Sequence, residues 1–334
     1  MNTQYLKNKS ILLFAPSFFG YDKEFLNGLQ KAGADVDLYN ERISENTFVK
    51  ILIRLNPNYL SGYVEKYYDN IIEENKDKNY DYVFFVSVEA ATPKIIGKLR
   101  SAFSNARFYM YSWDSVENKK YLKDVMPLFD RVWSFDKSDS DKYNIDFLPL
   151  FYSNEYSEIA SAGVLQKYDA LFVGTIHSDR YSFLKCIEKQ VHAQKGLVYY
   201  WQYFPSILLY IKMKVQSHRF CKEARFRDFR FESLNKEQLL KLIAESKAVI
   251  DSNHPSQSGL TMRTFETLGA KRKLITTNVN VKEYDFYRES NILVVDRLSP
   301  VIDSDFLNSE YEEIPSDIYM KYSLDGWLYH IFSE

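Results

Sequence analysis

The chain has 334 residues, which is enough to bury two hydrophobic cores of ordinary size. Its 43 basic residues nearly balance its 45 acidic residues, so the overall charge excludes a general attraction to nucleic acid. The first residues lack the apolar core of a signal peptide, and no run reaches the roughly 18 apolar residues of a membrane span. We therefore expect a cytoplasmic chain, and its two cysteines, which have no metal or redox spacing, fit a reducing compartment.

The first half of the chain alternates short apolar runs with helical segments, a pattern typical of a parallel sheet. The expected strands are 11–15, 36–39, 82–88, 107–112 and 132–135. The expected helices are 23–32, 44–79, 93–103 and 116–126, with a short helix after residue 136. The expected helix caps are Asp22, Asp136 and Asp139. No G-x-G-x-x-G follows the first strand, so a dinucleotide cofactor is not expected.

Two carboxylates of the first half lie where ligands bind to a parallel sheet. Glu89 directly follows the strand 82–88, and Asp114 follows the strand 107–112 beside Trp113. Because ligands bind outside the carboxyl ends of such strands, either group is a candidate general base. Asp114 also has an ordinary explanation, because it is well placed to cap the helix 116–126. The sequence leaves both roles open.

The second half opens with a change of composition. Residues 152–167 are polar and irregular, and we place the linker between two domains there. The run 168–174 is the expected first strand of the second domain, and a helix is expected from residue 181. The candidate ligand residues of the intervening loop are Gly174, Thr175, His177 and Arg180. A glycine lets the backbone approach a ligand, and an arginine binds phosphate, but His177 alone is better explained as a surface residue.

Residues 197–230 combine an apolar stretch with a basic one. Seven basic residues between 212 and 230 are accompanied by only two acidic residues. This pattern is typical of a segment in peripheral contact with an anionic membrane. It equally fits a strand and a helix of the second core with a solvated face. Pro205 excludes one continuous helix.

Residues 246–278 have the pattern strand, loop, helix, strand, with the helix expected over 260–270. The loop and first helical turn carry Ser258, Gly259, Thr261, Arg263 and Thr264, and Glu266 follows one turn later. A helix N-terminus and an arginine both bind phosphate. The Glu266 carboxylate suits a ribose or sugar hydroxyl, so the set predicts a nucleotide-sugar pocket.

The same residues also have an ordinary structural explanation. Serine and threonine before a helix are common caps. Arg263 and Glu266 are three residues apart and could form a solvated ion pair that contributes little. On spacing alone, this explanation is the stronger one.

The segment SGLTMRTFETLGAKRKLITTN, residues 258–278, resembles the signature of GT-B glycosyltransferases of the group 1 kind, closest to their CgeB-like lipopolysaccharide-biosynthesis branch. A helical Glu, the small-residue turn Gly269-Ala270 and a strand ending in Thr carry the resemblance. It implies that Glu266 binds the ribose or the donor sugar and that the loop before it cradles the diphosphate. Many retaining members carry a second Glu eight positions earlier, where this chain has Ser258, so the stereochemical outcome is not implied.

The resemblance further implies an α/β GT-B architecture, in which two Rossmann-like domains face a cleft. The expected acceptor domain is 1–152, with a helix of 316–334 crossing back to it, and the expected donor domain is 166–315. The expected reaction moves a sugar from a nucleotide-diphosphate sugar to a saccharide or lipid-linked acceptor during surface polysaccharide assembly, at the inner face of the membrane. Asp114, or failing that Glu89, is the expected base, and helix termini with arginines replace a metal ion.

Two other functions fit the same features. One is a GT-B-like nucleotide-sugar epimerase, which needs no second sugar. The other is a non-catalytic partner that binds a nucleotide sugar within a polysaccharide assembly complex.

Overall fold

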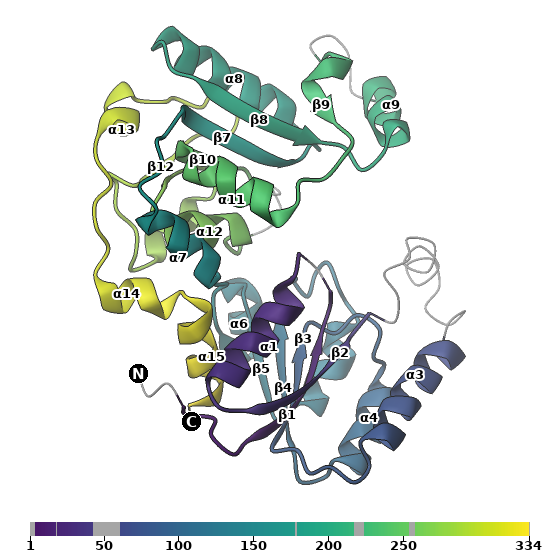
Figure 1. Cartoon of the computed structure of the whole chain (residues 1–334). Coiled ribbons are helices and arrows are strands. Elements are labelled where there is room, and N and C mark those ends of the chain that lie inside the picture. Colours follow the sequence, from purple (N-terminus) through teal and green to yellow (C-terminus); the bar gives the residue numbers. More distant parts are fainter. Residues whose placement is uncertain are drawn as a thin grey trace. The chain divides into compact units, whose positions relative to one another are not determined.

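A computed structural model describes residues 4–17, 19–42, 61–177, 179–216, 224–253 and 258–333 of the chain. The chain divides into two compact units, the first made of Met1–Leu150 and Leu324–Glu334 and the second of Phe151–Ser323 (Figure 1). The helix expected from residue 44 is described only from residue 61, and three charged residues of the basic stretch, Arg219, Lys222 and Glu223, lie outside the described residues.

The first unit contains a six-stranded parallel sheet with the strand order β2-β1-β3-β4-β5-β6. The strands are β1 (Ser10–Ala15), β2 (Asp35–Asn40), β3 (Tyr82–Val86), β4 (Arg107–Ser112), β5 (Arg131–Ser134) and β6 (Asp146–Phe147). The helices are α1 (Tyr21–Lys31), α3 (Ser61–Glu74), α4 (Pro93–Ala102), α5 (Leu122–Val125), α6 (Lys137–Tyr143) and α15 (Leu324–Phe332), with the 3₁₀ turn η2 (Met126–Leu128). The five strands predicted for the first half are confirmed.

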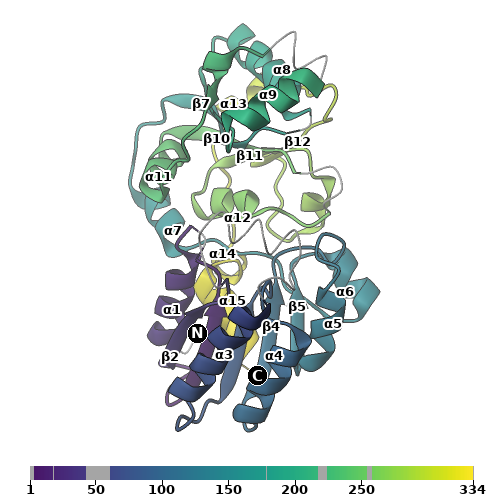
Figure 2. The same ribbon diagram turned by 90° about the vertical axis from the view of Figure 1, so that its right-hand side faces the viewer.

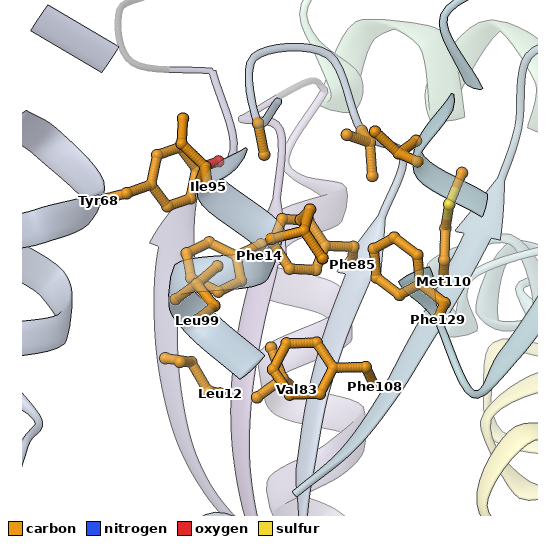
Figure 3. Close-up of a cluster of buried hydrophobic side chains, with 14 of the residues drawn as sticks. Leu12, Phe14, Tyr68, Val83, Phe85, Ile95, Leu99, Phe108, Met110 and Phe129 are labelled. Atoms are coloured by element: carbon orange, nitrogen blue, oxygen red, sulfur yellow. The ribbon is translucent and has the colours of Figure 1, made fainter. Parts of the chain in front are cut away.

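Helices cover both faces of this sheet, so its central strands are buried on both sides. One face packs against α3 and α4, and Figure 3 shows Leu12, Phe14 and Phe85 of the sheet beside Leu99 of α4. The rings of Phe14 and Phe85 stack with their centroids 4.4 Å apart. Strand-to-strand aromatic contacts of this kind stabilise the sheet beyond the burial of apolar area.

The opposite face packs against α1 and the C-terminal helix α15. The buried Trp327 ring lies 4.6 Å from that of Tyr111 on β4 and 5.6 Å from that of Phe25 on α1. A Cβ at Gly28 of α1 would lie 2.6 Å from the Leu328 side chain, so the glycine permits the close approach of the two helices. The last described residues of the chain therefore complete the core of the first unit.

The second unit contains another six-stranded parallel sheet, with the order β12-β11-β10-β7-β8-β9. The strands are β7 (Tyr168–Thr175), β8 (Val198–Tyr203), β9 (Phe229–Arg230), β10 (Ser246–Asp251), β11 (Lys273–Thr276) and β12 (Ile292–Val294). The helices are α7 (Asn154–Ser161), α8 (Arg180–Ala193), α9 (Ile207–Gln216), α11 (Lys236–Ala244), α12 (Met262–Gly269), α13 (Ser304–Asn308) and α14 (Ser316–Lys321), with the 3₁₀ turns η3 (Phe226–Asp228) and η4 (Val279–Glu283).

This sheet is also covered on both faces. Figure 2 shows α8 and α9 on one side of the sheet and α7 and α11 on the other. On the α11 side, Tyr156 of α7 is fully buried with Leu171 of β7 and Ile243 of α11. Residues 152–167 are thus not an irregular linker, because they include helix α7. This helix was not predicted because Tyr156 and Ile159 are its apolar residues in this core cluster, and two residues are too few to form a periodic pattern.

The helix expected over 116–126 is wrong for most of its length, since only Leu122–Val125 is helical. The backbone N–H of Val116 donates to Asp139 Oδ2 at 2.7 Å, and Pro127 in η2 ends the helical run. Asp139 therefore does not cap α6. Its carboxylate instead accepts a hydrogen bond from a loop distant in sequence, and sequence periodicity does not predict this contact.

Two other predicted caps have different outcomes. Asp136 caps α6 as expected, accepting from the N–H of Ser138 at 2.9 Å. Asp22 does not cap α1. Gly20, with φ 80°, holds the N-cap position, and Asp22 lies inside the first turn, where it accepts from Ser17 Oγ at 2.7 Å.

The predicted helix of the tail is interrupted at Tyr322 and Ser323, giving α14 and α15. The Tyr322 hydroxyl donates to Asp285 at 2.6 Å, and the Tyr322 carbonyl accepts from the N–H of Tyr152. These contacts take the Tyr322 backbone out of a continuous helix, so α14 belongs to the second unit and α15 to the first.

A test of the second core uses Gly269, at the end of α12. A Cβ built there would lie 2.5 Å from Cγ and 2.8 Å from Cβ of Tyr152, and this Cβ cannot move away easily because it is bonded to the backbone. We expect Gly269→Ala to lower the free energy of unfolding by about 1–3 kcal/mol, because overpacking displaces the tyrosine.

The matched control is Gly97→Ala in α4, where a Cβ meets nothing within 4 Å. Alanine is a better helix former than glycine, so this change should raise the free energy of unfolding by about 0.5–1 kcal/mol. Denaturant unfolding of both variants measures the difference, and equal stability of Gly269→Ala and the parent would contradict the packing described here.

Candidate functional site

The order of the strands places one topological switch point in each sheet. In a doubly wound sheet, ligands bind outside the carboxyl ends of the two neighbouring strands at this point, whose connections leave in opposite directions. In the first sheet these strands are β1 and β3, and in the second they are β7 and β10. The predicted donor residues lie at the end of β7 or follow β7 and β10, and Glu89 follows β3.

Arg180, the first residue of α8, joins the two strand ends of the second unit. Its Nη1 donates to the carbonyl of Thr175 at 2.7 Å, and its Nη2 donates to the carbonyl of Ser252, just after β10. The guanidinium also lies 5.6 Å from the centroid of the Phe172 ring. Burial lowers the pKa of Arg180 below its usual range, against the nearby charge of Asp251. Through these contacts Arg180 connects the end of β7 to the loop that follows β10.

The other candidates of this loop are placed by the length of β7. The strand extends through Gly174 and Thr175, so the loop begins at residue 176. His177 is half-buried, and its carbonyl accepts from the N–H of Arg180 at 3.2 Å. The loop that follows β7 is therefore shorter than the sequence indicated.

Asp251, the last residue of β10, is a buried carboxylate at the switch point of the second sheet. Its Oδ2 accepts from the hydroxyl of Thr261 at 2.6 Å and from that of Thr264 at 3.1 Å. Burial raises the pKa of Asp251, although these hydroxyls and the charges of Arg180 and Arg263 oppose the rise. Thr261 is the N-cap residue of α12 but makes no side-chain capping bond, because its hydroxyl faces Asp251.

Arg263 and Glu266 form an ion pair on the first turns of α12. Their Nη1 and Oε2 atoms lie 2.6 Å apart, and the side chains are only 19% and 8% exposed. The alternative of a solvated surface pair is therefore wrong. Removing water strengthens the attraction within the pair, and removing either partner leaves the other charge buried.

The loop before α12 is held from the end of β11. Asn278 Nδ2 donates to the carbonyls of Ser258 and Gly259 at 3.1 and 3.3 Å. Asn280 Nδ2 donates to the same Ser258 carbonyl at 3.0 Å. The predicted residues of this loop thus lie against the turn after β11, with their carbonyls anchored there.

Arg297 lies beyond β12 and belongs to the same edge. It forms a two-nitrogen ion pair with Asp179 at 2.7–3.1 Å and donates to the carbonyl of Asn253 at 2.8 Å. The guanidinium lowers the pKa of Asp179 through its hydrogen bond. Neither Asp251 nor Arg297 is among the site residues predicted from the sequence. Asp251 ends the apolar strand β10 and Arg297 closely follows β12, and this position could have identified both.

The carboxyl edge of the first sheet carries a linked ion-pair network. Glu89 accepts from Arg42 through both carboxylate oxygens at 2.7 Å and from Lys119 Nζ at 2.7 Å. Lys119 also pairs with Asp114 at 2.7 Å. Burial alone would raise the pKa of Glu89, but the hydrogen bond from Arg42 and the charge of Lys119 lower it to about 2.

This network bears on the choice of base. A carboxylate with a pKa near 2 is a poor proton acceptor at neutral pH, so the geometry does not favour Glu89. The Asp114 side chain is 39% exposed and pairs with Lys119. Because the residues after Asp114 do not begin a helix, its role as a cap of 116–126 is wrong.

Glu41 holds the backbone segment that carries Glu89. The residue is fully buried, and its Oε1 accepts from the backbone N–H groups of Glu89, Ala90 and Ala91 at 2.7, 2.7 and 3.1 Å. Oε2 has no hydrogen-bond partner among the described residues. Burial raises the pKa of Glu41 to about 7, against the three backbone hydrogen bonds.

Among the residues that the structure describes, no group of three or more His, Cys, Asp or Glu side chains has the arrangement of a metal site. Within the same residues, no helix has both the length and the apolar character needed to cross a bilayer.

Comparison with known proteins gives structural matches only. No protein-family profile and no curated sequence matches the chain. An E. coli trehalose-6-phosphate structure bound with UDP-2-fluoro glucose matches with a TM-score of 0.63 and 11% identity, covering 97% of this chain and 98% of that one. A glycosyltransferase from Rickettsia africae matches with a TM-score of 0.58 and 15% identity, covering 98% and 97%. An alpha-glucosyltransferase in complex with UDP and a 13-mer DNA has a TM-score of 0.57 and 13% identity, covering 97% and 95%.

These matches extend over nearly the whole chain, and the shared fold is that of the GT-B glycosyltransferases. The α/β fold class expected from the sequence is confirmed by the two six-stranded parallel sheets and their helices. The narrower lipopolysaccharide-biosynthesis branch receives no support from these comparisons and stays a prediction.

The raised pKa of Glu41 predicts a pH-dependent stability of the first unit. Below pH about 4.5 the carboxyl is protonated in both the folded and the unfolded chain, and the stability contribution is complete. Between pH 4.5 and about 7 the unfolded chain ionises first, so folding loses up to about 3 kcal/mol. Glu41→Gln keeps the acceptor oxygen and removes this titration.

Urea unfolding of both proteins across this pH range measures the effect. We expect the variant to gain stability relative to the parent steadily from pH 4.5 to 7. Glu89, Tyr67, Tyr68 and Tyr121 also interact electrostatically with Glu41, but they are common to both proteins. A stability difference that stays constant with pH would show that folding does not raise the pKa of Glu41.

Proposed function

We propose that this protein is a glycosyltransferase that uses a nucleotide-diphosphate sugar as donor and a saccharide as acceptor. One observation carries the proposal. The carboxyl edge of the second sheet brings together the N-terminus of α12, the Arg263–Glu266 pair and the buried Asp251 within a GT-B fold. Two of the structures with this fold hold UDP or a UDP sugar. Arginine and helix N–H groups suit a diphosphate, and a carboxylate suits a hydroxyl.

The donor would bind at the second unit. The diphosphate would lie at the N-terminus of α12, where the helix dipole and Arg263 favour negative charge. Glu266, one turn deeper, would accept a hydrogen bond from a ribose or sugar hydroxyl. The Asp251 carboxylate holds Thr261 and Thr264 by their hydroxyls, and this would keep the first turn of α12 in position without adding a group to the ligand.

The reaction would break the bond between the anomeric carbon and the diphosphate oxygen and form a bond from that carbon to an acceptor hydroxyl oxygen. The electron pair of the broken bond would stay on the diphosphate, where aligned N–H groups and Arg263 stabilise it. The acceptor proton would pass to Asp114 in the first unit. No metal ion is needed in this scheme, because helix and arginine supply the positive charge.

The acceptor class is proposed on the resemblance of residues 258–278 to the lipopolysaccharide-biosynthesis branch. We therefore propose a saccharide or lipid-linked saccharide acceptor in surface polysaccharide assembly at the cytoplasmic side. An epimerase would release a changed nucleotide sugar in the absence of any acceptor, so product analysis of a reaction without acceptor separates the two activities.

The donor site is tested by Arg263→Ala and Glu266→Ala. We expect each variant to bind the preferred nucleotide sugar about tenfold to a hundredfold more weakly, because each removes a charged hydrogen-bonding group. Titration calorimetry measures the affinity, after a thermal-shift screen of nucleotide sugars has identified the donor.

The matched control is Arg288→Ala, which removes an ion pair with Glu312 (3.2 Å) just before β12, at the amino end of the strands of the same unit. This variant should keep the parent affinity. Parent-like affinity in both Arg263→Ala and Glu266→Ala, with folding intact, would exclude α12 from the donor site.

The base is tested by Asp114→Asn. We expect kcat to fall about a hundredfold or more while the donor affinity stays unchanged, because the variant removes the proton acceptor and leaves the second unit intact. Glu89→Gln serves as the comparison and should have the smaller effect. Full activity of Asp114→Asn would assign the proton to another group.

A further inference from the structure

The helix α9 carries large aliphatic side chains that the described part of the chain leaves exposed. Leu208 and Val215 are 78% and 80% exposed, and Ile207, Leu209 and Ile211 are about half exposed. Single exposed apolar residues are common on protein surfaces, but five on one short helix are not. The helix follows β8 and lies beside β9, at one side edge of the second sheet (Figure 1).

The spacing of these side chains makes one stripe. At 100° per residue, positions 207, 208, 211 and 215 lie within about 100° of each other around the helix axis. Tyr210 lies outside this stripe and is buried, with its ring 5.6 Å from Phe204 and 5.4 Å from Phe229. Tyr210 thus anchors α9 to the core, and the stripe is left on the solvent side.

Exposed basic residues lie on α9 and on the segment 225–230, which contacts the helix through the rings of Phe226 and Tyr210, 5.5 Å apart. Lys212 on the helix and Arg225, Arg227 and Arg230 after it are exposed. In the described residues from 198 to 216 and from 224 to 231 the single acidic residue is Asp228. Its carboxylate accepts from the Tyr181 hydroxyl at 2.7 Å and from the N–H of Arg225 at 3.2 Å, so it is turned toward the protein.

We propose that α9 and the segment 225–230 form a surface that binds an anionic membrane. The stripe and the exposed Phe226 would enter the boundary between headgroups and acyl chains, and the arginines would contact anionic headgroups. A bilayer fits better than a protein partner, because a protein would need matching acidic groups, whereas anionic lipids supply negative charge along the whole surface.

The position of α9 in the sheet adds a functional consequence. Because β7, β8 and β10 are parallel, α9 starts from the same edge of the sheet as the loops that follow β7 and β10. Membrane binding would hold this edge near the bilayer. The binding itself is independent of the reaction, and it is measured without donor or acceptor.

The test is sedimentation of the full chain with vesicles. We expect binding to vesicles of phosphatidylcholine mixed with phosphatidylglycerol, weaker binding to phosphatidylcholine alone, and a decrease with salt. Leu208→Ser combined with Val215→Ser should lower the partition coefficient about tenfold or more. Arg225→Gln combined with Arg227→Gln should lower it by a similar factor and reduce the salt dependence.

Each variant has a control of matched exposure in the same unit. Leu298→Ser with Val301→Ser removes two other exposed aliphatic side chains, 80% and 69% exposed, and Lys241→Gln with Lys282→Gln removes two exposed cations. Both controls should bind like the parent. Failure of the parent to sediment with anionic vesicles would overturn the proposal, as would equal losses in the stripe variant and its control.

A second copy of the chain is the competing occupant. Analytical ultracentrifugation of the parent and of the Leu208→Ser, Val215→Ser variant distinguishes it. A concentration-dependent dimer that is lost in this variant, together with no vesicle binding by the parent, would assign the stripe to self-association instead.

Discussion

Every strand pair described in the two sheets is parallel, and the placement of the proposed chemistry depends on this constraint. Parallel strands end at one edge, and the crossover helices begin there with their positive dipole ends. Burial of both sheet faces leaves this edge as the place where polar side chains reach a ligand. The shared strand direction places the ion pairs of Glu89 at this edge of the first sheet. It places Asp251 and the threonines that donate to it at the same edge of the second sheet.

Charged side chains have different roles at the carboxyl edges of the two sheets. In the second unit, buried groups hold loops in place: Arg180 joins the ends of β7 and β10, and Asp251 holds the first turn of α12. A buried charge is tolerated only when it is hydrogen-bonded, so these contacts also fix loop geometry. In the first unit, Arg42 and Lys119 neutralise Glu89, and Glu41 orders the backbone that carries it. The carboxylate with the strongest partners is therefore the one least suited to accept a proton.

Elements defined by local interactions could be predicted from the sequence, and elements defined by contacts between distant residues could not. The strands β1, β3, β4 and β5 were predicted within a few residues, because buried parallel strands are short apolar runs with clear ends. Helix α4 was also predicted, since Thr92 and Pro93 mark its start locally. The segment 116–126 and the linker 152–167 were misjudged, because Asp139 holds the first and the contacts of Tyr156 make the second helical. Neither interaction has a local sequence signature.

By itself, the sequence determined the alternation of strands and helices, the parallel sheets and the location of the candidate donor residues between β10 and β11. Local periodicity and chain punctuation carry that information. Only the tertiary structure decided that Arg263 and Glu266 are a buried pair, that Arg180 binds carbonyls, and that Asp251, Arg297 and Glu41 belong to the two edges. It also decided that the apolar face of α9 is exposed. Burial and ion pairing depend on groups far apart in the chain, and residue type and spacing do not specify them.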